Sequence, residues 1–119
     1  MVVDIRKNKL INDPVLKKII EVIVNTVQPD KIILFGSRAK GTHSELSDYD
    51  LLILKSGIKP EDRRPLQRKI RDALRNAGIW NAIDVIVQSP QRFDYLSQDP
   101  FLVYHDIKKH STIIYEKRV

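Results

Sequence analysis

The sequence predicts an α/β (α+β) fold, in which helices pack on one mixed β-sheet. Two segments, 15–27 and 66–77, carry apolar residues at helical spacing. Three short runs, 31–35, 49–54 and 81–88, are rich in the aliphatic residues typical of buried strands. Helical and strand segments alternate and no linker separates them, so we expect all 119 residues to form a single domain.

The first half of the chain should form one helix and two strands. Asp13 and Pro14 mark the helix start, because aspartate accepts hydrogen bonds from first-turn amides and proline is tolerated there. The strand at 31–35 follows directly. The connection over 36–47 is polar and has room for one short helix before the strand at 49–54 begins.

The second half should form one long helix, a third strand and a smaller closing unit. Gly78 follows the long helix at a position that favours glycine. The strand at 81–88 comes next, and Pro90 interrupts the chain after it. We expect helical turns between 91 and 110 and a short final strand over 112–116.

The composition excludes several classes of protein. No cysteine is present, which removes disulfide frameworks, thiolate metal ligands and cysteine nucleophiles. The first ten residues, MVVDIRKNKL, lack the apolar core of a signal peptide, and no apolar run is long enough to span a membrane. We therefore expect a cytoplasmic protein without membrane association. The net charge of +6 favours an acidic partner, such as nucleic acid, an acidic protein or a nucleoside triphosphate.

Two carboxylates stand out in the stretch LFGSRAKGTHSELSDYDLLIL, which covers residues 34–54. Asp48 and Asp50 lie at the mouth of a strand and are two residues apart, so their side chains should point to the same face, about 7 Å apart along the chain. Two like charges side by side repel each other unless a cation lies between them. Carboxylate oxygens suit magnesium, and the pair therefore predicts a Mg²⁺ site.

The other end of the same stretch has the features of a phosphate site. Gly36 comes at a strand end, where the missing side chain lets the backbone approach a ligand closely. Ser37 adds a hydroxyl, and a helix that begins near it would offer free N–H groups to a phosphate. Arg38 and Lys40 are further candidates for contacts to an anion. The stretch as a whole could hold a triphosphate at one end and its metal ions at the other.

A third carboxylate, Asp84, lies within an apolar strand. An ionised group among isoleucine and valine is unfavourable unless it is paired or bound to a metal. If this strand lies beside that of Asp50, three carboxylates converge and could hold two metal ions, with Asp84 also acting as general base. The plainer alternatives are that Gly36 and Ser37 form a turn, that the first two aspartates form a solvated loop, and that Asp84 caps a neighbouring loop.

The spacing of these residues resembles the nucleotidyltransferase signature of the polymerase-beta superfamily. Gly36-Ser37 is followed after ten residues by Asp48-Tyr49-Asp50 and then by Asp84 on a later strand. The fuller string FGSRAKGTHSELSDYDLLI is similar to the minimal nucleotidyltransferases, the MntA-like antitoxin group. The resemblance implies a palm-like mixed sheet, two Mg²⁺ ions and ATP as substrate.

Residue by residue, the resemblance implies nucleotide phosphate contacts at Gly36 and Ser37. It implies metal ligation at the three aspartates, Asp48, Asp50 and Asp84. Arg38 matches a frequent arginine of the family, and we assign it a nucleotide-phosphate or helix-end role.

The resemblance also implies a partner and a reaction. Members of the group typically pair with a HEPN-domain ribonuclease toxin, and some neutralise it by attaching AMP to its tyrosine. We therefore expect AMP transfer from ATP to a hydroxyl group of a partner protein. Two alternatives stay open: an antitoxin that masks its toxin by contact without catalysis, and an enzyme that adds nucleotides to RNA ends. The acceptor, the preferred base and the oligomeric state, a homo-oligomer included, are not determined by the sequence.

The second long helix has a basic side. Its positively charged residues are Arg63, Arg64, Arg68, Lys69, Arg71 and Arg75. Such a side could contact RNA or an acidic partner, although charge runs on helices are usually solvated faces. The sequence leaves that choice open.

Overall fold

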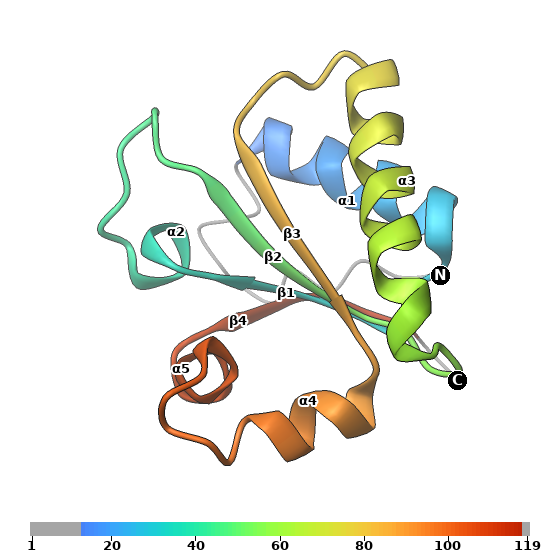
Figure 1. The fold of residues 1–119 in the computed structure, drawn as a ribbon. Coiled ribbons are helices and arrows are strands. Elements are labelled where there is room, and N and C mark those ends of the chain that lie inside the picture. The colour runs from blue at the N-terminus through green and yellow to red at the C-terminus, as the bar shows by residue number, and fades with distance from the viewer. Residues whose placement is uncertain (1–12, 118–119) are drawn as a thin grey trace.

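The computed structural model describes residues 13–117, within which four strands form one sheet with helices on both faces (Figure 1). The helical elements are α1 (Pro14–Val27), α2 (Ser37–Lys40), the 3-10 turn η2 (Pro60–Asp62), α3 (Arg63–Asn76), α4 (Pro90–Leu96) and α5 (Val103–Lys109). The strands are β1 (Lys31–Phe35), β2 (Tyr49–Leu54), β3 (Ile83–Gln88) and β4 (Thr112–Glu116). The predicted α/β fold is confirmed.

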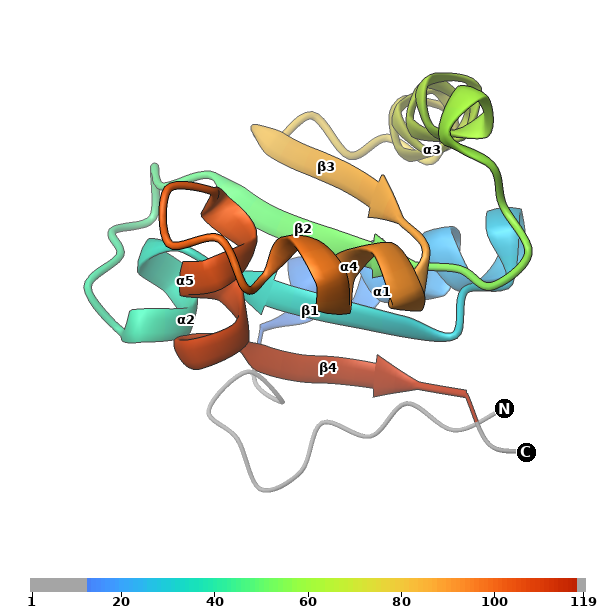
Figure 2. The ribbon, with the colours of Figure 1, turned by 60° about the horizontal axis from the view of Figure 1, so that its bottom comes forward.

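The sheet is mixed, with the strand order β3-β2-β1-β4 (Figure 2). β1 is antiparallel to both β2 and β4, whereas β2 and β3 run parallel. A parallel pair requires a crossover connection, and α3 provides it. Because β2 and β3 run in the same direction, the residues at their starts meet at one end of the sheet.

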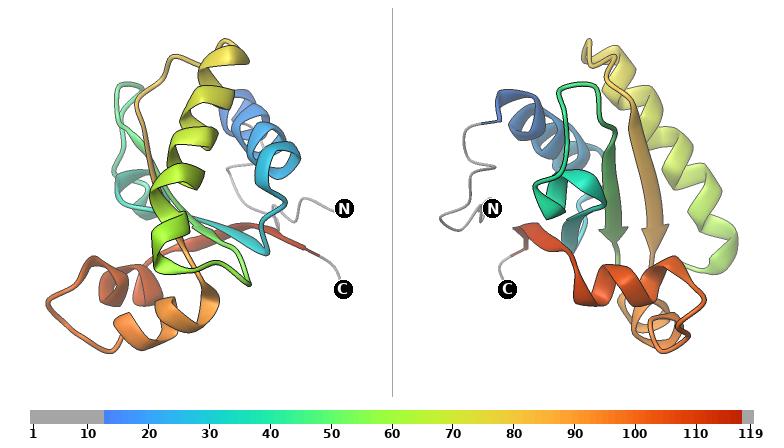
Figure 3. Two further views of the ribbon diagram at one scale, coloured as in Figure 1. Left: turned by 45° about the vertical axis from the view of Figure 1, so that its right-hand side comes forward. Right: turned by 90° about the vertical axis from the view of Figure 1, so that its left-hand side faces the viewer.

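Both faces of the sheet are buried, which explains why the strands read as continuous apolar runs. Alternate residues such as Ile32 and Leu34 pack with α1 and α3, which lie side by side on one face (Figure 3). The intervening residues of β1 and β2, such as Ile33 and Leu52, pack with α4 and α5 on the other face. None of the helices within residues 13–117 combines a bilayer-spanning length with a sufficiently apolar sequence.

Some predicted boundaries shift. The long helix begins at Arg63 rather than at residue 66, because η2 leads into it and the Lys59 N–H donates a hydrogen bond to the Asp62 carboxylate (2.8 Å). The third strand begins at Ile83 rather than at residue 81. The helical turns expected between 91 and 110 are two separate helices, α4 and α5. The short helix in the 36–47 connection and the final strand are as predicted.

Tyr49 connects β2 to the start of α1. Its hydroxyl donates a hydrogen bond to one oxygen of the Asp13 carboxylate (2.8 Å), and the other oxygen accepts from the Leu16 N–H (3.0 Å). The second bond is the N-cap contact that the sequence predicted. Burial, the hydrogen bond to Asp13 and the charge of Asp13 together raise the pKa of Tyr49 to about 12.

We expect the stability advantage of the wild type over Tyr49→Phe to shrink in alkaline solution. The Tyr49 phenol keeps its proton in the folded state up to about pH 12, whereas its ordinary pKa is 10.0. Between these values the unfolded chain binds fewer protons than the folded one, so the free energy of unfolding falls as the pH rises. Urea unfolding of both proteins from about pH 8 to about pH 11 measures the effect. A difference in stability that does not change with pH would contradict it.

Candidate functional site

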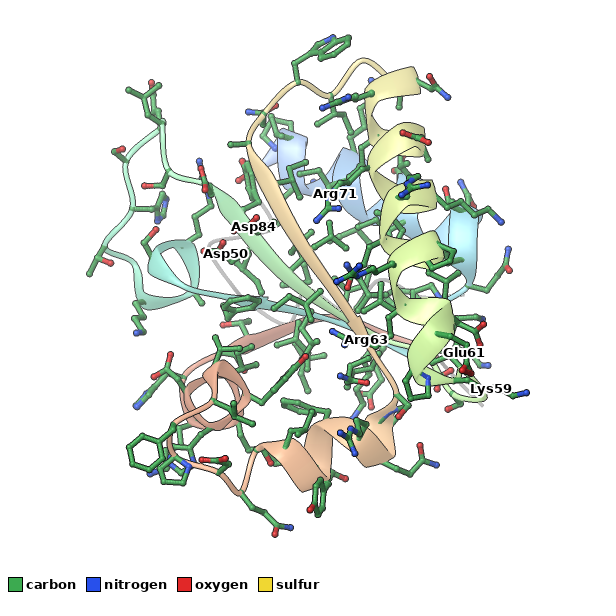
Figure 4. All side chains as sticks on the ribbon, in the orientation of Figure 1. Asp50, Lys59, Glu61, Arg63, Arg71 and Asp84 are labelled. Atoms are coloured by element: carbon green, nitrogen blue, oxygen red, sulfur yellow. The ribbon has the colours of Figure 1, made fainter. Side chains whose placement is uncertain are left out.

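Three carboxylates meet at the end of the sheet where β2 and β3 begin. Asp50 and Asp84 are paired residues of these two parallel strands, and Asp48 comes just before β2. One carboxylate oxygen from each of the three lies within 4.8 Å of the others. Figure 4 shows Asp50 and Asp84 next to each other on adjacent strands. The sequence-based prediction that the three carboxylates converge is confirmed.

The pairing register explains why the side chains share one face. Successive residues of a strand point to opposite faces, so Asp50 points to the same side as Leu52, which packs with α4 and α5. Tyr49 points to the α1 side. Asp84 pairs with Asp50 directly and therefore shares its face. A shift of one residue in this register would separate the two carboxylates.

The three carboxylates differ in their surroundings. Asp50 is half-buried, whereas Asp48 and Asp84 are exposed. Burial raises the pKa of the Asp50 carboxyl above its ordinary value, and the charges of Asp84 and Asp48 and a hydrogen bond with Asp84 raise it further. A cation between the carboxylates would reverse this effect, because opposite charge favours the ionised form.

The donor set fits a hard divalent cation. All three groups supply carboxylate oxygens, and they lie close enough together to coordinate the same ion or two neighbouring ions. Two of the three are open to solvent, so water and substrate phosphates can complete the coordination. The arrangement therefore suits magnesium held by carboxylates and phosphate oxygens.

Gly36 makes the approach of the chain to Asp50 possible. It lies between β1 and α2 with φ 75° and ψ −155°, a conformation that is essentially restricted to glycine. A Cβ atom at this position would overlap the Asp50 carboxylate. The structure thus shows a close approach of Gly36 to the Asp50 side chain, whereas the predicted approach to a ligand stays a prediction. The phosphate contacts predicted for Gly36 and Ser37 stay predictions.

Arg38 holds the loop that leads to Asp48. Its guanidinium donates to the Ser47 carbonyl (3.0 and 3.2 Å) and to the Glu45 carbonyl (3.3 Å). It also lies over the Tyr49 ring, 3.8 Å from the centroid, and 3.8 Å from the Asp13 carboxylate. Tyr49 points away from the Asp50 face, so these contacts place the guanidinium on the opposite side of the sheet from the Asp50 carboxylate. They support a role in positioning the loop, and the predicted phosphate contact of Arg38 stays untested.

The contacts of the Arg38 guanidinium with the loop carbonyls, Tyr49 and Asp13 were not predicted from the sequence. Its partners are backbone carbonyls six to nine residues later and Asp13 at the start of α1, and carbonyls leave no trace in side-chain spacing. The position of Arg38 in the short helix did not indicate toward which face of the sheet its guanidinium would point. The one feature of the sequence that could have indicated these contacts is Tyr49, whose ring the Arg38 guanidinium covers.

We expect Arg38→Lys to loosen the loop and lower activity. Lysine keeps the charge but not the planar fork that reaches two carbonyls and covers the Tyr49 ring. The free energy of unfolding should fall by about 1–3 kcal/mol, the usual contribution of hydrogen bonds from a charged donor. Amide hydrogen exchange over residues 42–48 should become faster. Lys40→Ala is the control for unfolding and hydrogen exchange, because its exposed ion pair with Asp106 contributes about 0–1 kcal/mol. Equal effects of the two substitutions would contradict the role assigned to Arg38.

A cavity of about 420 Å³ lies on the same face of the sheet, between β1 and the helices α4 and α5. It is lined by apolar residues such as Ile33 and Phe93 together with charged ones such as Lys31 and Asp94, and none of the three site aspartates borders it. The carboxylates instead lie at an open end of the sheet. A site of this form can admit a group that belongs to a large molecule.

Comparisons with known proteins agree with this geometry. A family model described as "Polymerase beta, Nucleotidyltransferase" matches residues 17–118. No curated protein is significantly similar to the chain. A candidate nucleotidyltransferase from Sulfolobus solfataricus has a similar structure, with 21% identity, a TM-score of 0.61, and coverage of 87% of this chain and 78% of the other.

Two further solved structures belong to toxin–antitoxin pairs. One is a toxin–antitoxin with AMP-PNP, with 20% identity, a TM-score of 0.50, and coverage of 86% of this chain and 73% of the other. The second is a mutant of the toxin–antitoxin MntA-HpeT, with 18% identity, a TM-score of 0.53 and the same coverage. At these identities the likeness shows a shared fold.

Proposed function

The chain belongs to the polymerase beta nucleotidyltransferase family, and on this premise we propose that it transfers AMP from ATP to a hydroxyl group of a partner protein. The observation that carries the proposal is the meeting of Asp48, Asp50 and Asp84 at the open end of β2 and β3. Three carboxylates on one face are unfavourable for stability alone, since they repel one another. They are favourable where cations and phosphates must be held.

In the proposed AMP transfer the three aspartates have separate roles. The acceptor hydroxyl oxygen attacks the α-phosphorus of ATP, and the bond from that phosphorus to the β-phosphate bridging oxygen breaks. The acceptor becomes an AMP ester, and pyrophosphate leaves. Asp84, exposed on the outer strand of the sheet, takes the hydroxyl proton as general base. Asp48, Asp50 and Asp84 would hold two magnesium ions, whose charge stabilises the triphosphate as the bond breaks.

Rigid elements position these groups. Asp50 and Asp84 are fixed by the ladder between β2 and β3, and Asp48 by the loop that Arg38 holds. In the proposed complex Gly36 and Ser37, at the end of β1, contact the nucleotide phosphates. Gly36 already brings the backbone against the Asp50 carboxylate, so phosphates bound there would lie beside the metal ligands.

We propose a HEPN-domain toxin as the partner protein. The support is the family resemblance of the motif, together with the shared fold of two solved toxin–antitoxin proteins, one of them with AMP-PNP. The open position of the site agrees with an acceptor group presented on a protein surface.

The experiment incubates the purified chain with magnesium, ATP labelled at the α-phosphate and a purified HEPN-domain toxin as the proposed acceptor. We expect the label on the partner protein with wild type and with Asp94→Asn, a control whose exposed carboxylate pairs with Lys108 and is not part of the carboxylate cluster. Asp48→Asn should transfer no label. Label on RNA ends instead of protein would contradict the proposed acceptor. Equal neutralisation of the toxin by wild type and Asp48→Asn, without label, would show an antitoxin that acts by contact.

A further inference from the structure

A line of exposed arginines runs along α3 on the side next to β3. Arg64, Arg68, Arg71 and Arg75 follow one another at intervals of four, three and four residues, which places them on one stripe of the helix. None of the four forms an ion pair or a side-chain hydrogen bond with another residue of the described range 13–117. Like charges one turn apart destabilise a helix, so the stripe is unfavourable for folding alone.

The arginine stripe borders two adjoining depressions. One, of about 300 Å³, is lined by Arg64, Gln67, Arg68, Arg71, Asp72 and Arg75. The other, of about 290 Å³, shares Arg71 and Arg75 and continues to Trp80, Asn81, Ala82 and Ile83. The surface therefore runs without interruption from the start of α3 to the residue before Asp84.

Trp80 lies at the end of this surface nearest the carboxylates. Its side chain is 77% exposed, which is unusual for the largest apolar side chain. It also lines the second depression together with Arg71 and Arg75. In the view of Figure 4, Arg71 lies on the α3 side of β3 and Asp84 lies on the other side. An extended ligand on the stripe would thus reach the loop that leads into β3, on the side of this strand opposite the carboxylates.

We propose that this surface, formed by Arg64, Arg68, Arg71, Arg75 and Trp80, binds single-stranded RNA. Guanidinium groups bind phosphates in bidentate fashion, and a row of them at helical spacing can follow a phosphodiester backbone. An exposed indole beside such a row offers a stacking surface for an unpaired base. A peptide of acidic residues alone would satisfy the arginines and leave the indole uncovered, whereas single-stranded RNA supplies phosphates for the arginines and unpaired bases for the indole. The proposal is independent of which hydroxyl group accepts AMP.

The first test measures binding of a fluorescently labelled single-stranded RNA of about 12 nucleotides by anisotropy, a length within the usual site sizes. Arg68→Gln/Arg71→Gln should lower the affinity by about tenfold or more at low salt. It should also reduce the slope of log affinity against log salt by about 1.4, since each phosphate contact contributes about 0.7. Lys69→Gln is the matched control, because Lys69 is exposed on the same helix but on another side. It should change the affinity less than about twofold.

The second test uses Trp80 itself, which is the single tryptophan of the chain. Stacking on a base should quench its fluorescence when RNA is added, and a polyglutamate peptide of equal charge should not. Arg64→Gln/Arg75→Gln serves as a second variant, with circular dichroism to confirm folding. Equal losses with Lys69→Gln, absence of RNA binding, or stronger binding of polyglutamate than of RNA would each overturn the proposal; the last would identify an acidic protein surface as the ligand.

Discussion

Asp50→Asn should abolish nucleotidyl transfer and leave the protein folded. An amide oxygen lacks the charge that offsets the dehydration of magnesium, so the ion should no longer bind. Charge stabilisation by the metal is worth several kcal/mol, so the rate should fall about a thousandfold or more. Asp48→Asn should behave in the same way. The measurement is release of pyrophosphate in the presence of ATP, magnesium and the partner protein, with Asp94→Asn as control.

The same substitution should raise stability at neutral pH. The pKa of Asp50 is raised in the folded state by burial and by the charges of Asp84 and Asp48. The folded protein therefore keeps a proton that the unfolded chain has lost, and stability declines as the pH rises through the raised pKa. Asparagine carries no charge, so Asp50→Asn should remove this decline. A variant that unfolds more readily than wild type at neutral pH in metal-free buffer would contradict the repulsion assigned to this site.

Gly36→Ala should disrupt both stability and activity. The backbone of Gly36 has a conformation that costs other residues about 1–3 kcal/mol, and the added Cβ would overlap the Asp50 carboxylate. The chain must then move, and Asp50 with it, so we expect a loss of about 3 kcal/mol or more when strain and displacement combine. Activity should fall at least about a hundredfold, because a displacement of about 1 Å in a catalytic group has that effect.

Gly41→Ala separates the two causes. Gly41 has the same φ of 75° but a ψ of 12°, in the ordinary left-handed region, and a Cβ built there would meet no residue beyond its chain neighbours within 4 Å. Its replacement should cost only the strain of the left-handed conformation, about 1–2 kcal/mol, and activity should persist. Urea unfolding and pyrophosphate release of both variants provide the measurement. Equal effects of the two substitutions would show that the contact with Asp50 has no importance.

Most of the fold could be predicted from the sequence, because β1 and β2 are buried on both faces and α1 begins at a clear N-cap. The run from Lys31 to Phe35 and that from Tyr49 to Leu54 match β1 and β2 residue for residue. The start of the third strand was placed two residues early: Ala82 extends the apolar run and its carbonyl accepts from the Tyr49 N–H, but regular pairing begins at Ile83. The convergence of the carboxylates required the assumption that the strand of Asp84 lies beside that of Asp50, which the parallel register confirms.

The three carboxylates of the candidate site could be predicted from the sequence, whereas the contacts of Gly36 and Arg38 could not. Asp48 and Asp50 are close in the sequence, so strand geometry alone brings them together. The contact between Gly36 and Asp50 depends on the pairing of Phe35 with Asp50 across β1 and β2, which no local pattern reveals. The position of the Arg38 guanidinium depends on a loop closing over it. Both contacts form only once the sheet has assembled, so no local pattern in the sequence indicates them.

The most direct test of the account is the position of metal ions in crystals grown with manganese and AMP-PNP. We expect anomalous scattering peaks from two ions about 3.5–4 Å apart, bonded to Asp48, Asp50 and Asp84, with the triphosphate beside Gly36 and Ser37. A bound nucleotide whose phosphates lie elsewhere, with no peak among the three carboxylates, would contradict it.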